Sequence, residues 1–137
     1  FPASRLHIEV TETAALSEGL LIAEQLRKLK GAGASIVIDD FGVGYSSLSR
    51  LRHMPVDTLK IDASFILDMI EDPDDAAIAN AVVSLGRALN LRVIAEGVER
   101  VDHQAALESW GCDLMQGFLY SKPLPVAELT AWLRQFS

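Results

Sequence analysis

Short apolar runs, each containing or ending in a polar residue, alternate along this chain with stretches of helical periodicity. The runs occupy residues 6–10, 35–39, 58–62, 92–96 and, more weakly, 113–116. Most of them are rich in Ile, Val or Leu, which is typical of strands that are buried on both faces of a parallel sheet. The alternation of strands with helices therefore predicts an α/β architecture.

The stretches between the runs predict helices. We expect a first helix over residues 14–30, ended by Gly31, and a second helix that Pro73 opens. Asp102 is expected to cap a short third helix that Gly111 ends. The apolar stripes of these helices and of a last helix are predicted to be core: Ala15, Ile22, Leu26 and Leu29; Ile78, Ala81, Val82, Leu85 and Leu89; Ala106 and Trp110; Leu129, Trp132, Leu133 and Phe136. Three leucines off the first stripe predict that the first helix is covered over a wide arc: Leu16, Leu20 and Leu21.

A parallel sheet of this kind can be a doubly wound open sheet or part of a (β/α) barrel. A doubly wound sheet usually has a glycine-rich phosphate turn after its first strand, and residues 10–13 contain no glycine. A complete eight-stranded barrel needs roughly 250 residues, whereas this chain has 137. With about five strand–helix units readable, the sequence predicts the C-terminal portion of a (β/α)8 TIM-type barrel.

Composition limits the classes of partner. Half of the residues are hydrophobic and 23% are charged, as in a chain with a packed core. The 19 acidic and 12 basic residues give a net charge of −7, which argues against binding to DNA or RNA polymers. The lone cysteine, Cys112, excludes an internal disulfide and is expected to be a small buried hydrophobe in a reducing, cytoplasmic compartment.

No apolar run approaches the roughly 18 residues of a membrane span, so we expect no membrane contact from this segment. A chain that opens at Phe1 without a start Met is expected to be cut from a longer protein. A membrane-anchored protein with this segment as its cytoplasmic module is one candidate for that longer protein.

Polar side chains with chemical potential recur in or directly after the five runs. They are Glu9, Asp39, Asp40, Lys60, Glu96 and Gln116, spaced about 20–36 residues apart. Such gaps fit one strand, one helix and the return, so these groups are expected to meet at the carboxyl ends of the strands. Barrel enzymes have their active sites at this rim.

The set predicts a metal site for phosphate-ester chemistry. Carboxylates are hard ligands suited to Mg²⁺ or Mn²⁺. Two ions that share Asp39 could clamp the attacking and leaving oxygens of a phosphate ester. Lys60 could orient a metal-bound hydroxide or neutralise developing charge. Zinc is not expected, because there is no cysteine cluster and the three histidines, His7, His53 and His103, lack ligand spacing.

Structural roles compete with these functional ones. A lone acidic residue at a strand end is more often a helix cap, and His7 is more often a packed histidine than a ligand. Lys60, between two apolar residues, could be a buried ion-pair partner. The adjacent carboxylates Asp39 and Asp40 are harder to explain structurally, because beside a buried strand they are costly without a partner.

Five motifs in order resemble the EAL-domain phosphodiesterases, which hydrolyse the bacterial second messenger cyclic di-GMP. The motifs are Glu9-Val10-Thr11-Glu12; Asp39-Asp40-Phe41-Gly42-Val43-Gly44-Tyr45-Ser46-Ser47-Leu48; Leu59-Lys60-Ile61-Asp62; Ala95-Glu96-Gly97-Val98-Glu99; and Gln116-Gly117-Phe118 through Ser121-Lys122-Pro123. The resemblance covers the chain from Leu6 to about Phe136, and chance agreement on five ordered motifs is implausible.

The resemblance implies a modified (β/α)8 barrel that opens the cyclic dinucleotide to linear pGpG with two Mg²⁺ or Mn²⁺ ions. By position, the metal-binding carboxylates are Glu9, Asp39, Asp40 and Glu96, and the catalytic set is Lys60, Glu96, Glu99 and Gln116. In this set Lys60 holds the water, Glu96 orients or activates it, and Glu99 and Gln116 support metal, water and substrate. Glu12 corresponds to the anchor of the loop over residues 41–48, a loop that the family links to metal binding and to dimerisation, so a homodimer is expected.

The chain also departs from the family pattern. Residues 1–137 correspond to the C-terminal half of the domain, so we expect the N-terminal half of the barrel as a further partner. The Glu-Ala-Leu signature, an asparagine metal ligand and a phosphate-gripping arginine belong to that N-terminal half. Val43 replaces the more usual Thr or Ala, with little effect expected. The fragment alone is expected to be inactive. A non-catalytic cyclic di-GMP receptor or interaction module, and more weakly an enolase-like metalloenzyme, remain alternatives.

Overall fold

The described residues form one parallel sheet of five strands. The structure is a computed structural model that describes residues 1–17, 19–44 and 48–136. The strands are β1 (His7–Thr11), β2 (Ser35–Phe41), β3 (Thr58–Ile61), β4 (Arg92–Glu96) and β5 (Leu114–Gln116). Their order in the sheet is β1-β2-β3-β4-β5, and all neighbouring pairs are parallel. Strands that follow in chain order without reversal are those of a barrel segment rather than of a doubly wound sheet, which confirms the predicted α/β class.

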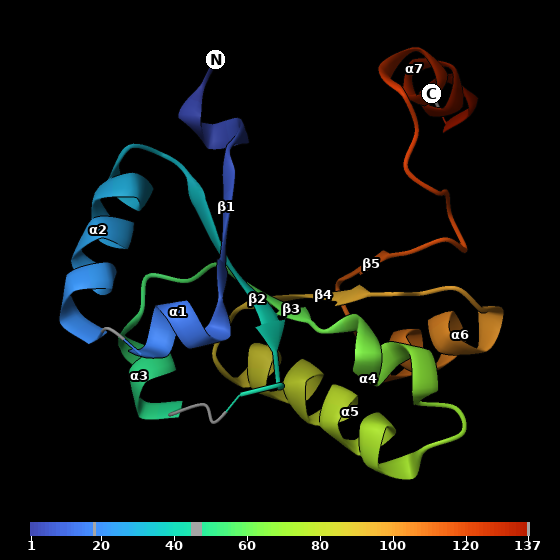
Figure 1. Cartoon of the computed structure of the whole chain (residues 1–137), viewed down its shortest axis with the longest axis horizontal. Coiled ribbons are helices and arrows are strands. Elements are labelled where there is room, and N and C mark those ends of the chain that lie inside the picture. Colours follow the sequence, from blue (N-terminus) through green and yellow to red (C-terminus); the bar gives the residue numbers. More distant parts are fainter. Residues whose placement is uncertain (18, 45–47, 137) are drawn as a thin grey trace.

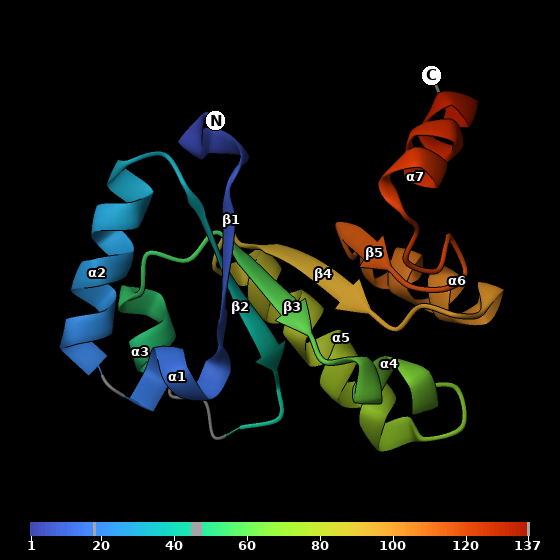
Figure 2. The ribbon, with the colours of Figure 1, turned by 45° about the horizontal axis from the view of Figure 1, so that its top comes forward.

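Helices connect successive strands and follow the last one (Figure 1). They are α1 (Glu12–Ser17), α2 (Gly19–Gly31), α3 (Leu48–His53), α4 (Ala63–Asp68), α5 (Pro73–Ala88), α6 (Val101–Trp110) and α7 (Val126–Leu133), with short 3-10 turns η1 (Ala3–Arg5) and η2 (Arg134–Phe136). In Figures 1 and 2, α7 stands apart from the sheet at the end of an extended segment. Among the described residues, no helix has the length and apolar character that a membrane crossing requires.

The core lies between one face of the sheet and the helices. Strand side chains on this face are fully buried and belong to a cluster with α4, α5 and α6: Ile38, Leu59, Ile61, Val93, Ala95, Ile66, Val82, Val83 and Leu107. The opposite face of the sheet carries the alternate residues, including Glu9, Lys60 and Glu96. This division places the polar strand residues on one side and the stabilising apolar contacts on the other.

The first predicted helix is wrong as a continuous element. The chain forms α1 and α2 in its place, and its buried side chains are Ala15, Ala23 and Leu26. Leu29 and Leu21 are exposed, so the predicted wide covered arc is also wrong for the described part. The side chains of Leu16 and Leu20 lie outside the described residues.

The predicted face of the second helix is rotated. Helix α5 begins at Pro73 as expected, capped by Asp72, but its buried residues are Ala79, Val82, Val83 and Gly86. Ile78 and Ala81, expected in the core, are exposed. Both stripes are apolar at helical spacing, and packing against β4 favours the one whose small residues permit a close approach.

Two further predictions about helix ends and cores need correction. Helix α6 begins after Arg100, and Asp102 lies inside it, where its carboxylate accepts the N–H of His103 at 3.0 Å. Gly111, with φ of 81°, ends α6 as predicted. Helix α7 has no buried residue among those described, because no other element of the described chain covers it, so its apolar stripe is not core here. Helices α3 and α4 were not anticipated.

Two aspartates connect the amino ends of neighbouring strands by hydrogen bonds. Asp57, just before β3, accepts the N–H of Ile36 in β2 at 2.9 Å and an N–H of Lys30 at 2.8 Å. Asp113, just before β5, accepts the N–H of Val93 in β4 at 2.8 Å. Partial burial raises the pKa of Asp57, but the hydrogen bonds from Lys30 and Ile36 outweigh this effect and the pKa is lowered overall.

We predict that Asp57→Asn lowers the free energy of unfolding at neutral pH by about 1 kcal/mol, because charge-assisted hydrogen bonds are lost. The ionised Asp57 stabilises the fold at pH above the unfolded-state pKa of about 3.8, and this contribution is lost as pH falls through the lower folded-state pKa. Urea unfolding of wild type and variant at pH 7 and pH 3 measures the difference. A difference of equal size at both pH values would contradict the assignment.

Candidate active site

Lys60 lies at the centre of the site, in the middle strand of the sheet. Its Nζ atom is 2.7 Å from Glu96 Oε1 and 3.1 Å from both carboxylate oxygens of Glu9. Asp39 Oδ1 lies further away, at 3.9 Å. The side chain of Lys60 is only 7% exposed. Strands β1, β2 and β4 thus each direct one carboxylate toward a buried ammonium group on β3.

The carboxylates keep Lys60 charged. Burial disfavours the ammonium form and by itself lowers the pKa of Lys60. The hydrogen bonds with Glu96 and Glu9, and the negative charge of Asp39, outweigh burial, so the pKa is raised above its ordinary value. At neutral pH Lys60 is therefore a cation that donates hydrogen bonds, and it does not serve as a base.

A bulge in β2 brings two consecutive carboxylates to the site. Ile38 pairs with Leu59 and Phe41 with Ile61, so β2 has one residue more than β3 over this interval. Asp40 has a φ of 54°, a left-handed conformation that aspartate tolerates better than most residues. In a regular strand Asp39 and Asp40 would point to opposite faces, and the bulge removes that alternation.

Asp40 sits in a negatively charged environment. Burial is the main cause that raises its pKa, and the charges of Asp39, Asp62 and Glu96 act in the same direction. Asp62 caps α4 by accepting the N–H of Ser64 at 2.8 Å. Burial raises the pKa of Asp62, but its hydrogen bonds with Ser64 and Asp40 outweigh burial and lower it.

Three of the predicted metal ligands form a group that fits one divalent ion. Asp39, Asp40 and Glu96 each offer a carboxylate oxygen, and these oxygens lie within 4.8 Å of one another. Oxygen donors of this type suit Mg²⁺ or Mn²⁺, and a cation there would relieve the repulsion among the carboxylates, which adds to the effect of burial on the pKa of Asp40. Glu9, the fourth predicted ligand, is linked to this group by Lys60, whose ammonium contacts both Glu9 and Asp39.

Glu12 ties β1 to the segment after β2. Its side chain is 3% exposed, and Oε2 accepts the N–H groups of Gly42 at 3.0 Å and Gly44 at 3.3 Å. Within the described residues Oε1 has no hydrogen-bond partner. The predicted anchored loop covers residues 41–48, of which residues 45–47 lie outside the described part.

Glu99 and Gln116 flank the cluster. Gln116 pairs with Glu96 across β4 and β5, so both residues lie at the same end of the sheet. Glu99 lies three residues beyond Glu96, on the turn that leads into α6, and its backbone N–H donates to His103 Nδ1. The structure therefore brings Glu9, Asp39, Asp40, Lys60 and Glu96 together, with Gln116 beside them and Glu99 on the adjoining turn.

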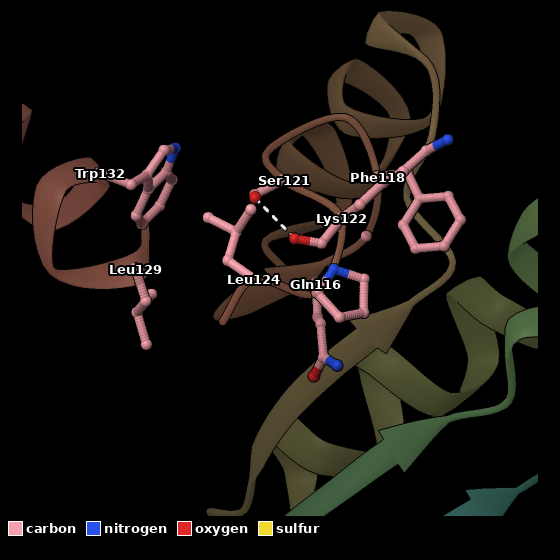
Figure 3. A pocket seen from close by; sticks show the side chains of 9 residues that line it. Gln116, Phe118, Ser121, Lys122, Leu124, Leu129 and Trp132 are labelled. Atoms are coloured by element: carbon pink, nitrogen blue, oxygen red, sulfur yellow. Dashed lines mark hydrogen bonds between the residues drawn. The ribbon is translucent and has the colours of Figure 1, made fainter. Parts of the chain in front are cut away.

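Two features of the site were not predicted as functional. Asp62 completes the third apolar run and contacts Asp40, so the same strand-end pattern that selected Glu9 could have found it. A pocket of about 370 Å³ begins at Gln116 and extends to Leu129 and Trp132 of α7 (Figure 3). The ammonium group of Lys122 lies 5.6 Å from the centre of the Phe118 ring in this wall.

Comparison with known proteins assigns the family. The family model of the EAL domain matches residues 1–123. The chain is 47% identical over 128 residues to the bifunctional diguanylate cyclase/cyclic di-GMP phosphodiesterase MucR of Pseudomonas aeruginosa, covering 93% of this chain and 19% of that protein. It is 45% identical to the cyclic di-GMP phosphodiesterase NbdA of the same organism, covering 96% of this chain and 17% of the relative. The chain belongs to the EAL domain family.

Solved structures agree with this assignment. A complex of the Pseudomonas aeruginosa MucR phosphodiesterase with cyclic di-GMP superposes with a TM-score of 0.92 at 46% identity, covering 94% of this chain and 52% of that chain. Klebsiella pneumoniae BlrP1 with manganese and cyclic di-GMP gives a TM-score of 0.81 at 38% identity, covering 90% of this chain and 31% of that chain. The chain therefore spans about half or less of these solved chains and less than a fifth of the length of the two curated relatives.

Proposed function

We propose that this chain is the C-terminal part of an EAL domain that hydrolyses cyclic di-GMP to linear pGpG with two Mg²⁺ or Mn²⁺ ions. The observation that carries the proposal is the buried Lys60 ammonium, held by carboxylates from three other strands at the carboxyl end of the sheet. The names of MucR and NbdA support the activity, and the manganese complex of BlrP1 supports the need for a divalent cation.

The reaction adds one water molecule to one phosphodiester bond. The water oxygen attacks phosphorus, the bond from phosphorus to the 3′ oxygen breaks, and a proton from the water ends on that oxygen. The product has a 5′ phosphate and a free 3′ hydroxyl, as linear pGpG requires. Bound divalent cations supply Lewis acidity and neutralise the phosphate charge.

Residues of this chain would position the attacking water and its protons. The Lys60 ammonium donates a hydrogen bond to the water oxygen, and its raised pKa keeps it in the donor form. Glu96, 2.7 Å from Lys60 Nζ, is placed to accept a proton from the same water. Gln116 and Glu99 would support the bound substrate. Glu12 holds the backbone segment that follows Asp40.

Assembly and location follow from the same proposal. Apolar side chains at Val43 and Leu48 are more than half exposed on either side of residues 45–47, which supports a homodimer formed through this loop. An intracellular messenger as substrate and the Cys112 thiol support a cytoplasmic location. A non-catalytic receptor function is the outcome if the complete domain binds cyclic di-GMP without turnover.

The test of the function is hydrolysis of cyclic di-GMP by the complete domain and by its Asp39→Asn variant. Loss of one ligand charge should lower turnover at least ~100-fold and weaken Mn²⁺ binding, while Asn keeps an oxygen to accept the Asp40 N–H. Asp74→Asn, the same change on exposed α5, is the matched control and should leave both unchanged. Near-normal turnover by the Asp39 variant would exclude the metal assignment.

Lys60→Met tests the role of the lysine, because methionine keeps most of the apolar stem without the charge. If Lys60 holds the water, kcat should fall about 100-fold while KM changes little. Lys28→Met, which removes a charge from an exposed ion pair with Glu24, is the control. A variant that folds normally and shows only a raised KM would make Lys60 a phosphate clamp instead.

We predict that the 137 residues alone do not hydrolyse cyclic di-GMP. Within the part of the chain that the structure describes, both edge strands of the sheet, β1 and β5, lack an outer partner strand, and a barrel of this kind has about eight strands. Mixing the chain with a separately produced N-terminal half should restore Mn²⁺-dependent turnover, measured as pGpG formation. Robust turnover by the purified monomeric chain would show that residues from Glu9 to Gln116 suffice.

A further inference from the structure

His103 is a fully buried polar residue outside the carboxylate cluster. It lies in the first turn of α6 and is 1% exposed. Its Nδ1 accepts the backbone N–H of Glu99 at 3.4 Å, so the ring proton of the neutral imidazole is on Nε2. Within the described residues Nε2 has no hydrogen-bond partner. A buried donor without a partner is costly, so packing alone is a poor reason for a histidine at this position.

The N–H that His103 receives belongs to the turn that joins two candidate catalytic residues. Residues 97–99 follow Glu96, and Gly97 adopts a φ of 76°. A Cβ atom at Gly97 would lie 2.9 Å from the Ala63 side chain, so α4 closes one side of the turn. The turn is therefore confined at the point where the backbone leaves Glu96.

Backbone hydrogen bonds connect the same turn to the end of β5. The N–H of Val98 donates to the carbonyl of Gln116 at 3.1 Å, and the N–H of Leu119 donates to the carbonyl of Val98 at 3.0 Å. A Cβ atom at Gly117 would lie 2.1 Å from the Val98 carbonyl oxygen, so the two backbones are in direct contact. The turn is thus held directly against the backbone that follows the register pair of Glu96 and Gln116.

The hydrogen bond donated by the Glu99 N–H differs from the two backbone hydrogen bonds of Val98, because its acceptor is a side chain. Helix α6 begins after Arg100, whose side chain provides no capping hydrogen bond, and His103 reaches back from the third helical position instead. Without an acceptor there, the Glu99 N–H would lose this partner beside the buried Val98 and the turn would relax.

We propose that His103 is a positioning residue for the hydrolysis. Its Nδ1 fixes the 97–99 turn and thereby sets the placement of Glu96, Glu99 and Gln116 around the substrate. The proposal rests on the proposed function for its kinetic consequence, and on the geometry of the turn for its structural one. Small displacements of positioned groups change turnover more than substrate binding.

The test compares two nearly isosteric variants of the complete domain, His103→Asn and His103→Leu. Asparagine places an oxygen where Nδ1 stands and can accept the Glu99 N–H, whereas leucine fills similar space without an acceptor. We expect His103→Leu to lower kcat about 10-fold or more with KM within about 2-fold, and His103→Asn to stay within about 3-fold of wild type. Equal losses in both variants, or no loss in His103→Leu, would overturn the proposal.

Two measurements separate this proposal from the proposed function. Calorimetric Mn²⁺ affinity and hydrogen exchange of the Glu99 amide need no turnover, and both should change in His103→Leu and be restored in His103→Asn. If wild type does not hydrolyse cyclic di-GMP, the proposed function fails, and these two measurements still decide the role of His103. Urea unfolding shows whether His103→Leu folds. If it does not fold, the unbranched His103→Met replaces it, and the same loss of kcat is expected. Unchanged exchange and Mn²⁺ affinity in the variant without an acceptor would exclude a positioning role.

Discussion

The placement of an ammonium group inside the sheet determines what the surrounding strands must provide. A buried cation on β3 is costly to desolvate and is tolerated only with close anionic partners. Glu9 on β1 and Glu96 on β4 meet this need at 3.1 Å and 2.7 Å, with Asp39 on β2 further out. The carboxylates in turn repel one another without a cation. Each charge is therefore tolerable because of the others, and the cluster depends on a register that aligns four strands.

The strand register explains how so many charged groups reach one place. Parallel neighbours place Glu96 beside Gln116, and the extra residue in β2 brings Asp40 to the rim together with Asp39. The cost of that arrangement appears at Asp40, whose backbone is left-handed and whose pKa is raised by burial and by neighbouring carboxylates. Such local strain next to a candidate catalytic centre is typical of sites organised for function rather than for stability.

The sequence was informative where a local pattern determines the outcome. Apolar runs of four or five residues can be buried in few ways, so all five strands were predicted, and the rule that parallel strands end at one rim brought Lys60 and its carboxylates together. It was uninformative where two local solutions were equally good. Helix α5 offers adjacent apolar stripes, and the choice of Ala79 over Ile78 depends on close packing against β4. The bulge at Asp39 and Asp40, and the contact of Asp62 with Asp40, depend on neighbours distant in the chain.

The two faces of the sheet separate stability from chemistry. Side chains such as Leu59, Ile61 and Val93 face the helices and are fully buried, so changes there act mainly on the core. Lys60, the residue between Leu59 and Ile61, faces the other way and meets the carboxylates. His103 crosses this division, because it is a buried residue of α6 whose side chain accepts the backbone N–H of Glu99, on the turn that follows Glu96. A helix residue of this kind can influence a site that it does not touch, since the turn it holds belongs to both layers.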